Sequence, residues 1–449
     1  MAIGKRKRTK QETLWIPTGQ IPVPPAHPFY ERLNAVLARH EFDDFVEQVC
    51  DRFYAPKMGR PGLIPGIYFR LLLIGYFEGL DSERGIAWRT ADSLALREFL
   101  GLALTEAPPD HSTISRTRRL IDLETHQAVF TWVLQRIADA GLLKGKTIGI
   151  DATTLEANAA LRSIVRRETG DSYQEFLIKL AKESGIETPT REDLARLDRN
   201  RARKGSNDDW THPNDPDARI TKMKDGRTHL AHKTEHAVDL ETGVVVGVTV
   251  QPANSGDTTT MIETLITAAE QVEAVLPQSK GIQEVVADKG YHSTDRIVDM
   301  KRIGLRTYIS ERKQPRRWRG DEEAQRAVYS NRRRIRGNRG KALLRQRGER
   351  LERPFAHLYE TGGMRRAHLR GHENILKRLL IHVSALNLGL LMRSAFGVGT
   401  PRTLQGRVFA LLSVFHHKIV ALYAGFETKK FIFGISRRPQ CVTAWLAAY

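Results

Sequence analysis

The chain has 449 residues, 41% of them hydrophobic, and its 71 lysines and arginines against 52 aspartates and glutamates give a net charge of +19. This length and apolar content predict a folded protein of several domains, and the positive charge favours polyanionic partners, nucleic acid first among them. Two cysteines, Cys50 and Cys441, exclude a disulfide framework and a C-x-x-C zinc pair.

The first 27 residues combine a basic run, KRKRTK, with the segment IPTGQIPVPPAHP, which predicts an extended, proline-rich arm. No apolar segment follows the basic run, as a secretory signal requires. The apolar stretches 379–392 and 408–424 are interrupted by polar residues and are not typical of membrane spans. We therefore expect a cytoplasmic, nucleoid-associated protein with no membrane partner.

Residues 28–141 carry the periodicity of amphipathic helices and predict a helical domain. Ser82, Ser93 and Ser112 each precede a helical run and are candidate N-caps. The domain therefore consists of several short helices separated by sharp turns.

The run DHSTISRTRRLI within this domain contains Arg116, Arg118 and Arg119. A short arginine-bearing helix after a tight turn is typical of a helix-turn-helix DNA reader. An ordinary helical bundle with a basic solvent face fits the segment equally well. The interpretation of residues 28–141 as a DNA-binding domain therefore needs support from elsewhere.

From Lys146 the pattern changes to short apolar runs. KTIGID predicts a strand that ends at Asp151, and THLAHKTEHAVDLETGVVVGVTV predicts a hairpin. DTTTMIETLITAAEQVEAVL predicts a helix capped by Asp257. The strand 283–287, a helix from Ser293 and the strand LRTYIS follow. The alternation predicts an α/β domain with a mixed sheet.

A polar insert at about residues 155–227 is too long for a simple connection and predicts a helical pair followed by a loop. Beyond residue 361 the chain is helical again to about residue 393, and residues 394–449 form an appendage of unassigned role. His232 and His236 have the spacing of helical zinc ligands, but their strand pattern favours a place on a strand surface.

Two aspartates follow apolar strand patterns, Asp151 after TIGI and Asp288 after VVA. If these strands are parallel neighbours, the carboxylates emerge together and repel each other unless a divalent cation neutralises them. Oxygen ligands suit Mg²⁺, with Mn²⁺ as an alternative. A third acid is expected on LLRQRGERLERPFAHL, where Glu352 flanks an apolar stripe and Glu349 is interpreted as solvated.

Residues 311–353 contain sixteen lysines and arginines against six acids, with Trp318 and Tyr329 interleaved. A solvated basic face is the alternative, but the position just before Glu352 favours contact with DNA, through phosphates and stacked bases. The predicted DNA contacts across the chain are Arg116, Arg118, Arg119, Lys289, Arg316, Arg317, Trp318, Arg332, Arg333, Arg345 and Arg353.

IGIDATTLEA, VVADKGYHS and RLERPFAHL, in this order, resemble the three catalytic blocks of the DDE transposases of bacterial insertion sequences. The resemblance covers most of the chain, from GRPGLIPGIYFRLLL to GGMRRAHLRGHENILKRLL. It implies a ribonuclease H-like catalytic domain over 146–393, an N-terminal all-helical domain and a helical C-terminal region. It also implies that Asp151, Asp288 and Glu352 form the metal-binding catalytic triad.

The chain departs from one pattern of that family. A large subgroup carries Tyr and Arg seven and four residues before the catalytic Glu, and Lys seven residues after it. Here Arg345, Gly348 and Tyr359 stand at those positions. Which residue takes the role of that subgroup's basic residues is then open among Arg345, Arg347 and Arg353.

The expected function is that of a DNA transposase, which binds the ends of its mobile element and catalyses metal-dependent strand cleavage and strand transfer. Double-stranded DNA is the expected partner, bound by a homo-oligomer. Two alternatives stay open: a DNA-binding protein derived from a transposase and lacking catalysis, and a ribonuclease H-like nuclease without strand transfer.

Overall fold

The computed structural model describes residues 26–55, 62–201, 205–223, 226–311, 318 and 320–402. Contacts divide the chain into one unit over 1–399 and another over 400–449, and nearly all described residues belong to the first. The predicted basic arm and most of the appendage lie outside the described residues, as do Arg316 and Arg317.

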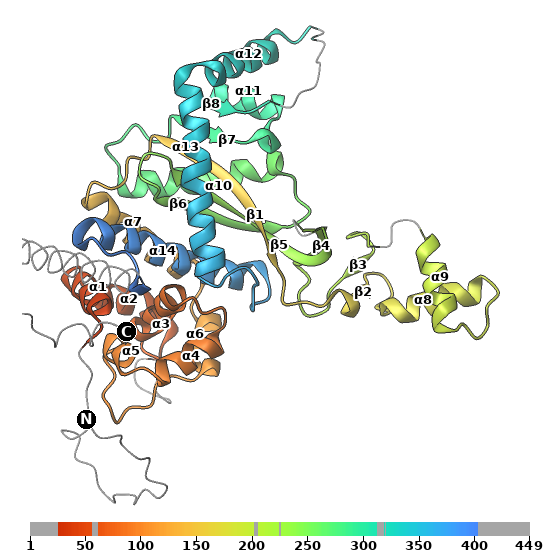
Figure 1. Ribbon diagram of the computed structural model, residues 1–449, viewed down its shortest axis with the longest axis horizontal. Helices are drawn as coiled ribbons and strands as arrows, with labels where there is room; N and C mark the ends of the chain where they lie inside the picture. The colour runs from red at the N-terminus through yellow and green to blue at the C-terminus, as the bar shows by residue number, and fades with distance from the viewer. Residues whose placement is uncertain are drawn as a thin grey trace, which may run out of the picture. The chain divides into compact units, whose positions relative to one another are not determined.

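The N-terminal part is helical, as predicted (Figure 1). Its elements are α1 (Pro28–Arg39), α2 (Phe42–Cys50), η2 (Asp51–Phe53), α3 (Pro65–Glu78), α4 (Glu83–Ala91), α5 (Leu94–Phe99), α6 (His111–Leu120) and α7 (Leu123–Asp139). Helix α3 is apolar on all sides and almost wholly buried, as expected of a central helix. Helix α14 (His372–Phe396) packs against α3 and α7, so a distant segment completes this helical part.

The helix starts confirm two of the three predicted N-caps. The hydroxyls of Ser82 and Ser93 accept hydrogen bonds from backbone amides at the starts of α4 and α5. Ser112 is not a cap: α6 begins one residue earlier, and the carboxylate of Asp110 accepts the Ser112 amide at 2.8 Å. An aspartate is as good a cap as a serine and here precedes it in the chain.

A mixed sheet forms the centre of the α/β part. Its strands are β1 (Thr147–Glu156), β4 (Arg219–Lys222), β5 (Thr228–Asp239), β6 (Val245–Pro252), β7 (Glu284–Ala287) and β8 (Arg306–Ile309). The order is β4-β5-β1-β7-β8, and β6 also pairs with β5. Strands β1, β5 and β6 are antiparallel neighbours, whereas β7 runs parallel to β1 and β8 parallel to β7. The predicted strand order and mixed α/β class are confirmed.

Helices cover both faces of this sheet. They are α10 (Asp257–Val275), η4 (Lys289–Tyr291), α11 (Thr294–Arg302), α12 (Glu322–Arg336), α13 (Asn338–Phe355) and the π-helix η5 (Ala356–Thr361). Successive residues of a strand point to opposite faces. On β5, Glu235 contacts Thr264 of α10, whereas His236 contacts Tyr359 of η5. Helix α10 therefore covers one face, and α13 with η5 covers the other.

A buried asparagine side chain pairs with the backbone of two edge strands, β6 and β8. The side-chain amide of Asn387 in α14 pairs with the backbone N–H and C=O of Val245 in β6. Asn331 in α12 does the same to Ile309 in β8. These bonds satisfy backbone groups that an open edge leaves available for pairing with another chain.

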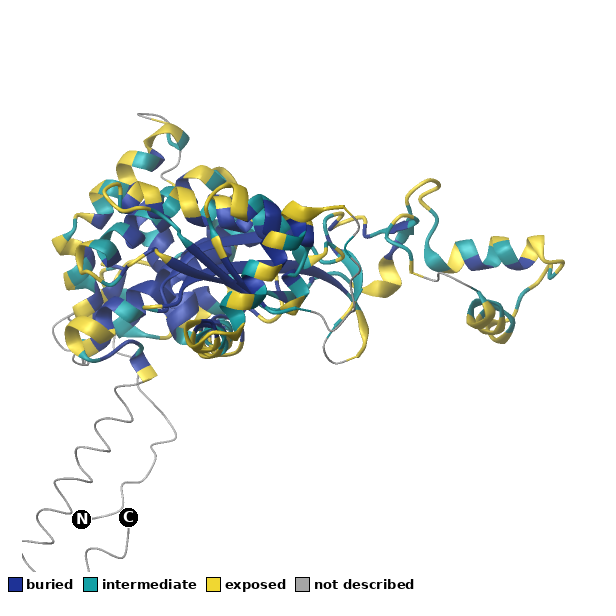
Figure 2. Ribbon diagram, turned by 90° about the horizontal axis from the view of Figure 1, so that it is seen from above, coloured by how far each residue is buried: buried dark blue, intermediate teal, exposed yellow. Residues whose placement is uncertain are grey.

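The insert between β1 and β5 contains the predicted helical pair, and the loop expected after it is interrupted by two short strands, β3 and β4. Its elements besides β4 are η3 (Leu161–Ser163), β2 (Val165–Arg166), α8 (Tyr173–Glu183), α9 (Arg191–Asn200) and β3 (Trp210–Thr211). Trp210 packs in a small apolar cluster with Ala157, Ile164 and Leu230. Figure 2 shows mostly exposed and intermediate residues on α8 and α9, and buried residues concentrated in the sheet.

Helix α14 is the one helix among the described residues that is long and apolar enough to cross a membrane by length and composition. In its most apolar 18-residue window, 89% is buried inside the chain. Packing against α3, α7 and β6 therefore accounts for its apolar sequence.

Candidate active site

Asp151 and Asp288 lie on neighbouring parallel strands. Strand β1 pairs with β7 in a register that ends with Gly149 opposite Val286. Continued by two residues, that register sets Asp151 beside Asp288. The two predicted strands are thus parallel neighbours, as the carboxylate prediction requires.

Asp151 does not end its strand, contrary to the prediction. Strand β1 continues to Glu156, because residues 151–156 pair antiparallel with His236 to Ala231 of β5. Strand β7 stops at Ala287, so β1 extends beyond its parallel neighbour from Asp151 onward. The site is therefore at the end of β7 and in the middle of β1.

Asp288 begins the short helix η4. Its Oδ1 accepts a hydrogen bond from the Gly290 amide at 2.6 Å, so the residue has the local turn role that Asp often takes. Lys289 points to solvent, whereas Tyr291 is buried. The turn therefore leaves Lys289 exposed beside Asp288, and it is held to the protein interior by the buried ring of Tyr291.

The Asp151 carboxylate faces helix α13. Its Oδ2 lies 2.9 Å from Nη2 of Arg347, and 27% of the Asp151 side chain is exposed. The helix approaches closely because β1 has a glycine there: a Cβ on Gly149 would lie 2.7 Å from Cδ1 of Leu351. Arg347 and Leu351, four residues apart, therefore fix α13 against the strand that carries Asp151.

Glu352 follows Leu351 directly and is exposed, as is Glu349. Across the parts of the chain that the structure describes, no three His, Cys, Asp or Glu side chains are grouped so that they could hold a metal ion. The structure places β1, which contains Asp151, beside β7, which ends before Asp288, and it places Glu352 on the helix packed against β1. The closure of all three acids around metal stays a prediction.

The two aspartates suit a hard divalent cation. Mg²⁺ is held by one or two carboxylates and keeps water and phosphate oxygens in its other positions. Here the positive charge beside Asp151 comes from the guanidinium of Arg347. Two carboxylates with one cationic side chain keep a net negative charge, so this oxygen-donor pair is chemically able to accept a metal ion.

Arg118, one of the predicted DNA contacts, is buried among the helices. Its guanidinium is buried, donates to Glu83 at 2.8 Å and pairs with Asn374, so it joins α6 to α4 and α14. The spacing on α6 explains the difference, because Arg118 lies on the face with Ile114 that turns inward. Arg116 and Arg119 are exposed on the same helix.

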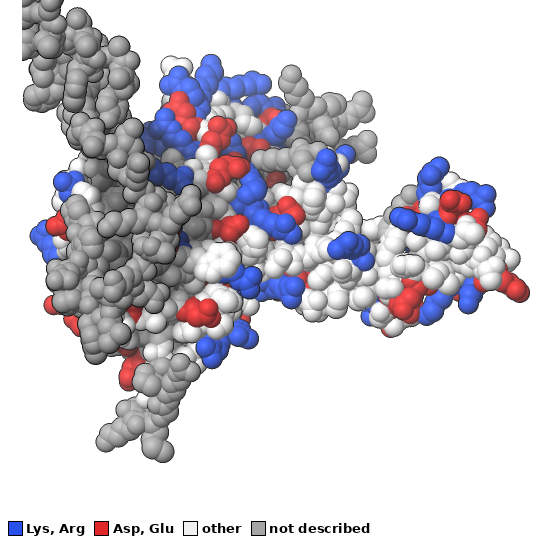
Figure 3. Space-filling model, turned by 60° about the horizontal axis from the view of Figure 1, so that its bottom comes forward, with Lys and Arg blue, Asp and Glu red and all other residues white. Residues whose placement is uncertain are grey.

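The basic residues of α12 and α13 lie mainly at the surface. Arg333, Arg345 and Arg353 are exposed. Arg332 pairs with Glu311 at 2.9 Å and lies 5.0 Å from the ring centre of Tyr329. In Figure 3, lysine and arginine side chains outnumber acidic ones on the face in view.

Trp318 is also close to Tyr329, with ring centres 6.0 Å apart and an edge-on geometry. Each of these two rings therefore already has an aromatic neighbour within the chain.

The two histidines of β5 have separate partners. Nε2 of His232 lies 3.1 Å from buried Asp215, and Nε2 of His236 lies 2.5 Å from the hydroxyl of Tyr359. Burial lowers the pKa of His236 to about 3. Tyr359, which stands where a subgroup of the resembling enzymes has lysine, is thus a buried partner of β5.

Residues on the α10 face of β5 were not among the predicted site residues. Glu235 is fully buried and binds the hydroxyl of Tyr291 at 2.8 Å, which ties it to the turn after Asp288. Burial raises the pKa of the Glu235 carboxyl above its ordinary value, against the effect of its hydrogen bonds. The sequence HKTEH could have indicated these residues, because it places charged residues on both faces of a strand with apolar flanks.

Asp257 also differs from its predicted role. Gly256 is the N-cap of α10 and no side chain caps the helix. The Asp257 carboxylate instead accepts a hydrogen bond from Nζ of Lys233 at 2.7 Å.

Comparison with known families gives two matches. Residues 20–120 match the family described as Transposase domain (DUF772), and residues 179–388 match the family described as Transposase DDE domain. No curated protein matches the chain. The second match contains Asp288 and Glu352, and Asp151 precedes it.

Proposed function

We propose a DNA-cutting and DNA-joining function from one premise: the chain belongs to the DDE transposases of insertion-sequence type. The specific proposal is that it binds the ends of its own mobile element, cleaves there in a metal-dependent reaction and transfers the cut end to target DNA. The mixed sheet with helices on both faces supports the ribonuclease H-like core that this family implies.

The observation that carries the proposal is the parallel pairing of β1, which contains Asp151, with β7, which ends just before Asp288. In this proposal these two carboxylates and Glu352 hold Mg²⁺ or Mn²⁺. Bound metal lowers the pKa of an attacking water and stabilises the leaving oxygen of a phosphodiester. No covalent intermediate on the protein is required.

The chain's own residues have three further tasks in this proposal. Exposed arginines of α12 and α13 bind phosphates and fix the DNA, without themselves reading sequence. Lys289, exposed next to Asp288, contacts a phosphate at the reacting end in this proposal. Arg347 balances the charge of Asp151 before a cation binds.

Helices α1 to α7, completed by α14, are proposed to bind the element ends, with Arg116 and Arg119 as the exposed basic residues of α6. A homo-oligomer on double-stranded DNA and a cytoplasmic, nucleoid-associated location are proposed with it. The high positive charge supports both binding to DNA and fast association with it.

Strand transfer separates this function from that of a nuclease. The test incubates the full chain, Mg²⁺, a plasmid and labelled DNA of an element end that already carries a free 3′ hydroxyl. A transposase joins the label to the plasmid, whereas a nuclease cuts the end DNA but never joins it. Binding without cutting or joining would favour a transposase-derived DNA-binding protein.

A further inference from the structure

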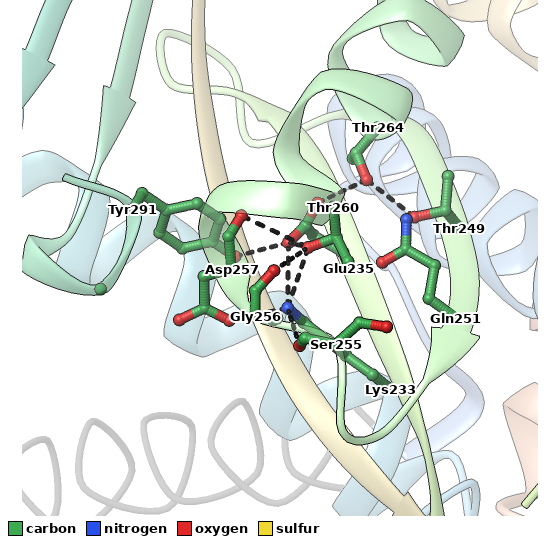
Figure 4. A network of polar contacts seen from close by, with 12 residues as sticks. Lys233, Glu235, Thr249, Gln251, Ser255, Gly256, Asp257, Thr260, Thr264 and Tyr291 are labelled. Atoms are coloured by element: carbon green, nitrogen blue, oxygen red, sulfur yellow. Dashed lines mark hydrogen bonds and ion pairs between the residues drawn. The ribbon is translucent and has the colours of Figure 1, made fainter. Parts of the chain in front are cut away.

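A buried polar network lies behind the turn that carries Asp288. At its centre is the Glu235 carboxylate, which accepts hydrogen bonds from Thr264 at 2.6 Å, Tyr291 at 2.8 Å and Thr260 at 2.9 Å (Figure 4). Glu235 has no exposed surface. Three hydroxyl donors from two separate elements, α10 and η4, therefore converge on one carboxylate of β5.

Lys233 joins the same network from two residues earlier on β5. Its Nζ donates to Asp257 at 2.7 Å and to Thr260 at 2.9 Å, and it lies 3.8 Å from Glu235 (Figure 4). The buried ammonium group of Lys233 therefore lies close to two carboxylates, those of Asp257 and Glu235. The start of α10 is held to β5 through side chains at this point.

The network encloses the Asp288 turn from behind. Tyr291 is the last residue of η4, and Asp288 is its N-cap. Between them, Gly290 is packed against two carboxylates: a Cβ there would lie 2.6 Å from Oδ2 of Asp257 and 2.9 Å from Oδ1 of Asp288. A side chain at position 290 would therefore require these carboxylates to shift.

Burying charged groups is costly, and apolar side chains of similar size often stabilise a fold as well or better. The contacts of Glu235 lead to a turn whose aspartate belongs to the candidate active site. Small displacements of such a residue have large effects on rate, since an error of about 1 Å can cost about 100-fold.

We propose that Glu235 and Tyr291 are positioning residues, which hold the Asp288 turn in place through their buried hydrogen bond. They act through Asp288 and touch neither DNA nor the reacting atoms. This role rests on the proposed function, because it takes Asp288 as a residue of the active site.

The chain offers a matched control for the hydroxyl of Tyr291. Tyr308 of β8 is also buried and donates its hydroxyl to a buried carboxylate, Glu284, at 3.3 Å. Glu284 is the first residue of β7, at the opposite end of that strand from Asp288. Tyr308→Phe therefore removes the same chemical group from the same strand neighbourhood without reaching the turn.

The experiment compares full-length wild type with Tyr291→Phe and Tyr308→Phe. We expect Tyr291→Phe to bind end DNA as wild type does, to cleave it about 10- to 100-fold more slowly at saturating DNA, and to need more Mg²⁺ for its half-maximal rate. Tyr308→Phe should cleave within about two-fold of wild type. Equal rates for Tyr291→Phe and wild type, or equal losses in both variants, would overturn the proposal.

Hydrogen exchange supplies a readout that does not depend on activity. Backbone amides of residues 288–292 should exchange faster in Tyr291→Phe than in wild type and Tyr308→Phe, because the turn opens locally. If wild type does not cleave, the proposed function fails, and exchange alone then tests the hold on the turn. Unchanged hydrogen exchange in Tyr291→Phe would show that the hydrogen bond of Tyr291 does not hold the turn in place.

Glu235→Gln keeps the size of the side chain but replaces one accepting oxygen with an amide group. It serves if Tyr291→Phe does not fold, and it should show the same faster exchange and slower cleavage. Wild-type exchange and cleavage in a folded Glu235→Gln chain would overturn the proposal.

Discussion

The two faces of strand β5 use charged residues in opposite ways. On the α10 face, Glu235 is fully buried and accepts three hydroxyl hydrogen bonds. On the α13 face, Asp151 of the adjacent strand is partly exposed and forms an ion pair with Arg347. A saturated carboxylate is fixed and unreactive, whereas one with an exchangeable partner can take a ligand. The first face should dominate stability and affect activity only through the Asp288 turn, whereas the second should determine activity directly.

The largest expected effect is on the α13 face. Glu352→Gln should slow cleavage of end DNA by about 10³-fold, since losing a metal contact removes several kcal/mol of transition-state stabilisation. Glu349→Gln is the matched control, because both glutamates are exposed on the same helix. Rates measured at saturating DNA should leave Glu349→Gln within about two-fold of wild type. A loss in Glu349→Gln alone would move the third acid to Glu349.

Stability should show the reverse contrast. Glu235→Ala should lower the free energy of unfolding by about 3–5 kcal/mol, because it leaves Lys233 and three hydroxyls buried without their carboxylate. Asp151→Asn should change it by less than about 1 kcal/mol, since the pair with Arg347 is partly solvated and the amide oxygen still accepts. Urea unfolding measures both, and a larger loss in Asp151→Asn would reverse the assignment of the two faces.

Glu235 and its neighbour His236 should also respond oppositely to pH. Burial raises the pKa of Glu235 from 4.5, so its contribution to stability is complete below pH 4.5 and is lost as pH rises through the raised pKa. Burial lowers the pKa of His236 from 6.5 to about 3, so its contribution is complete above pH 6.5 and is lost as pH falls.

The measurement is urea unfolding of wild type, Glu235→Gln and His236→Gln between pH 4.5 and 6.5. The stability of wild type relative to Glu235→Gln should fall as pH rises. Relative to His236→Gln it should fall as pH is lowered. If both stability differences change with pH in the same direction, the two faces do not differ in this way.

The smallest effect is expected at the exposed arginines of α6. The double variant Arg116→Ala, Arg119→Ala should reduce the slope of log affinity against log salt by about 2, one phosphate contact for each arginine. Arg39→Ala with Lys144→Ala removes two exposed charges outside α6 and should leave the slope unchanged. Equal slopes for both double variants would move DNA contact away from α6.

Local patterns predicted much of this fold from sequence. The alternation of apolar residues predicted the order of β1, β5, β6, β7 and β8, because each strand is specified by its own short segment. Ser82 and Ser93 were identified as caps for the same reason. The length of β1 was not predicted, because its last residues form a strand only through their pairing with β5.

Long-range packing accounts for the residues that were misplaced or missed. In the sequence, Arg118 resembles a surface arginine. In the structure it pairs with Asn374, which lies more than two hundred residues further along the chain. Glu235 is missed because sequence shows a charge in a strand but not the hydroxyls of α10 and η4 that bind it. The two aspartates were singled out because each follows a short apolar run, which is a local signal, whereas the approach of Glu352 depends on how α13 lies on the sheet.

The most direct test of the account is Asp288→Asn, with binding and cleavage of end DNA measured side by side in Mg²⁺. The matched control is Asp295→Asn, which removes one negative charge from an exposed position on the next helix. The account predicts that Asp288→Asn binds end DNA at least as tightly as wild type, because one negative charge near the phosphates is gone. Its cleavage should fall by about 10³-fold or more, while Asp295→Asn cleaves normally. Equal cleavage by wild type and Asp288→Asn would contradict the account and leave Asp288 as a turn residue only.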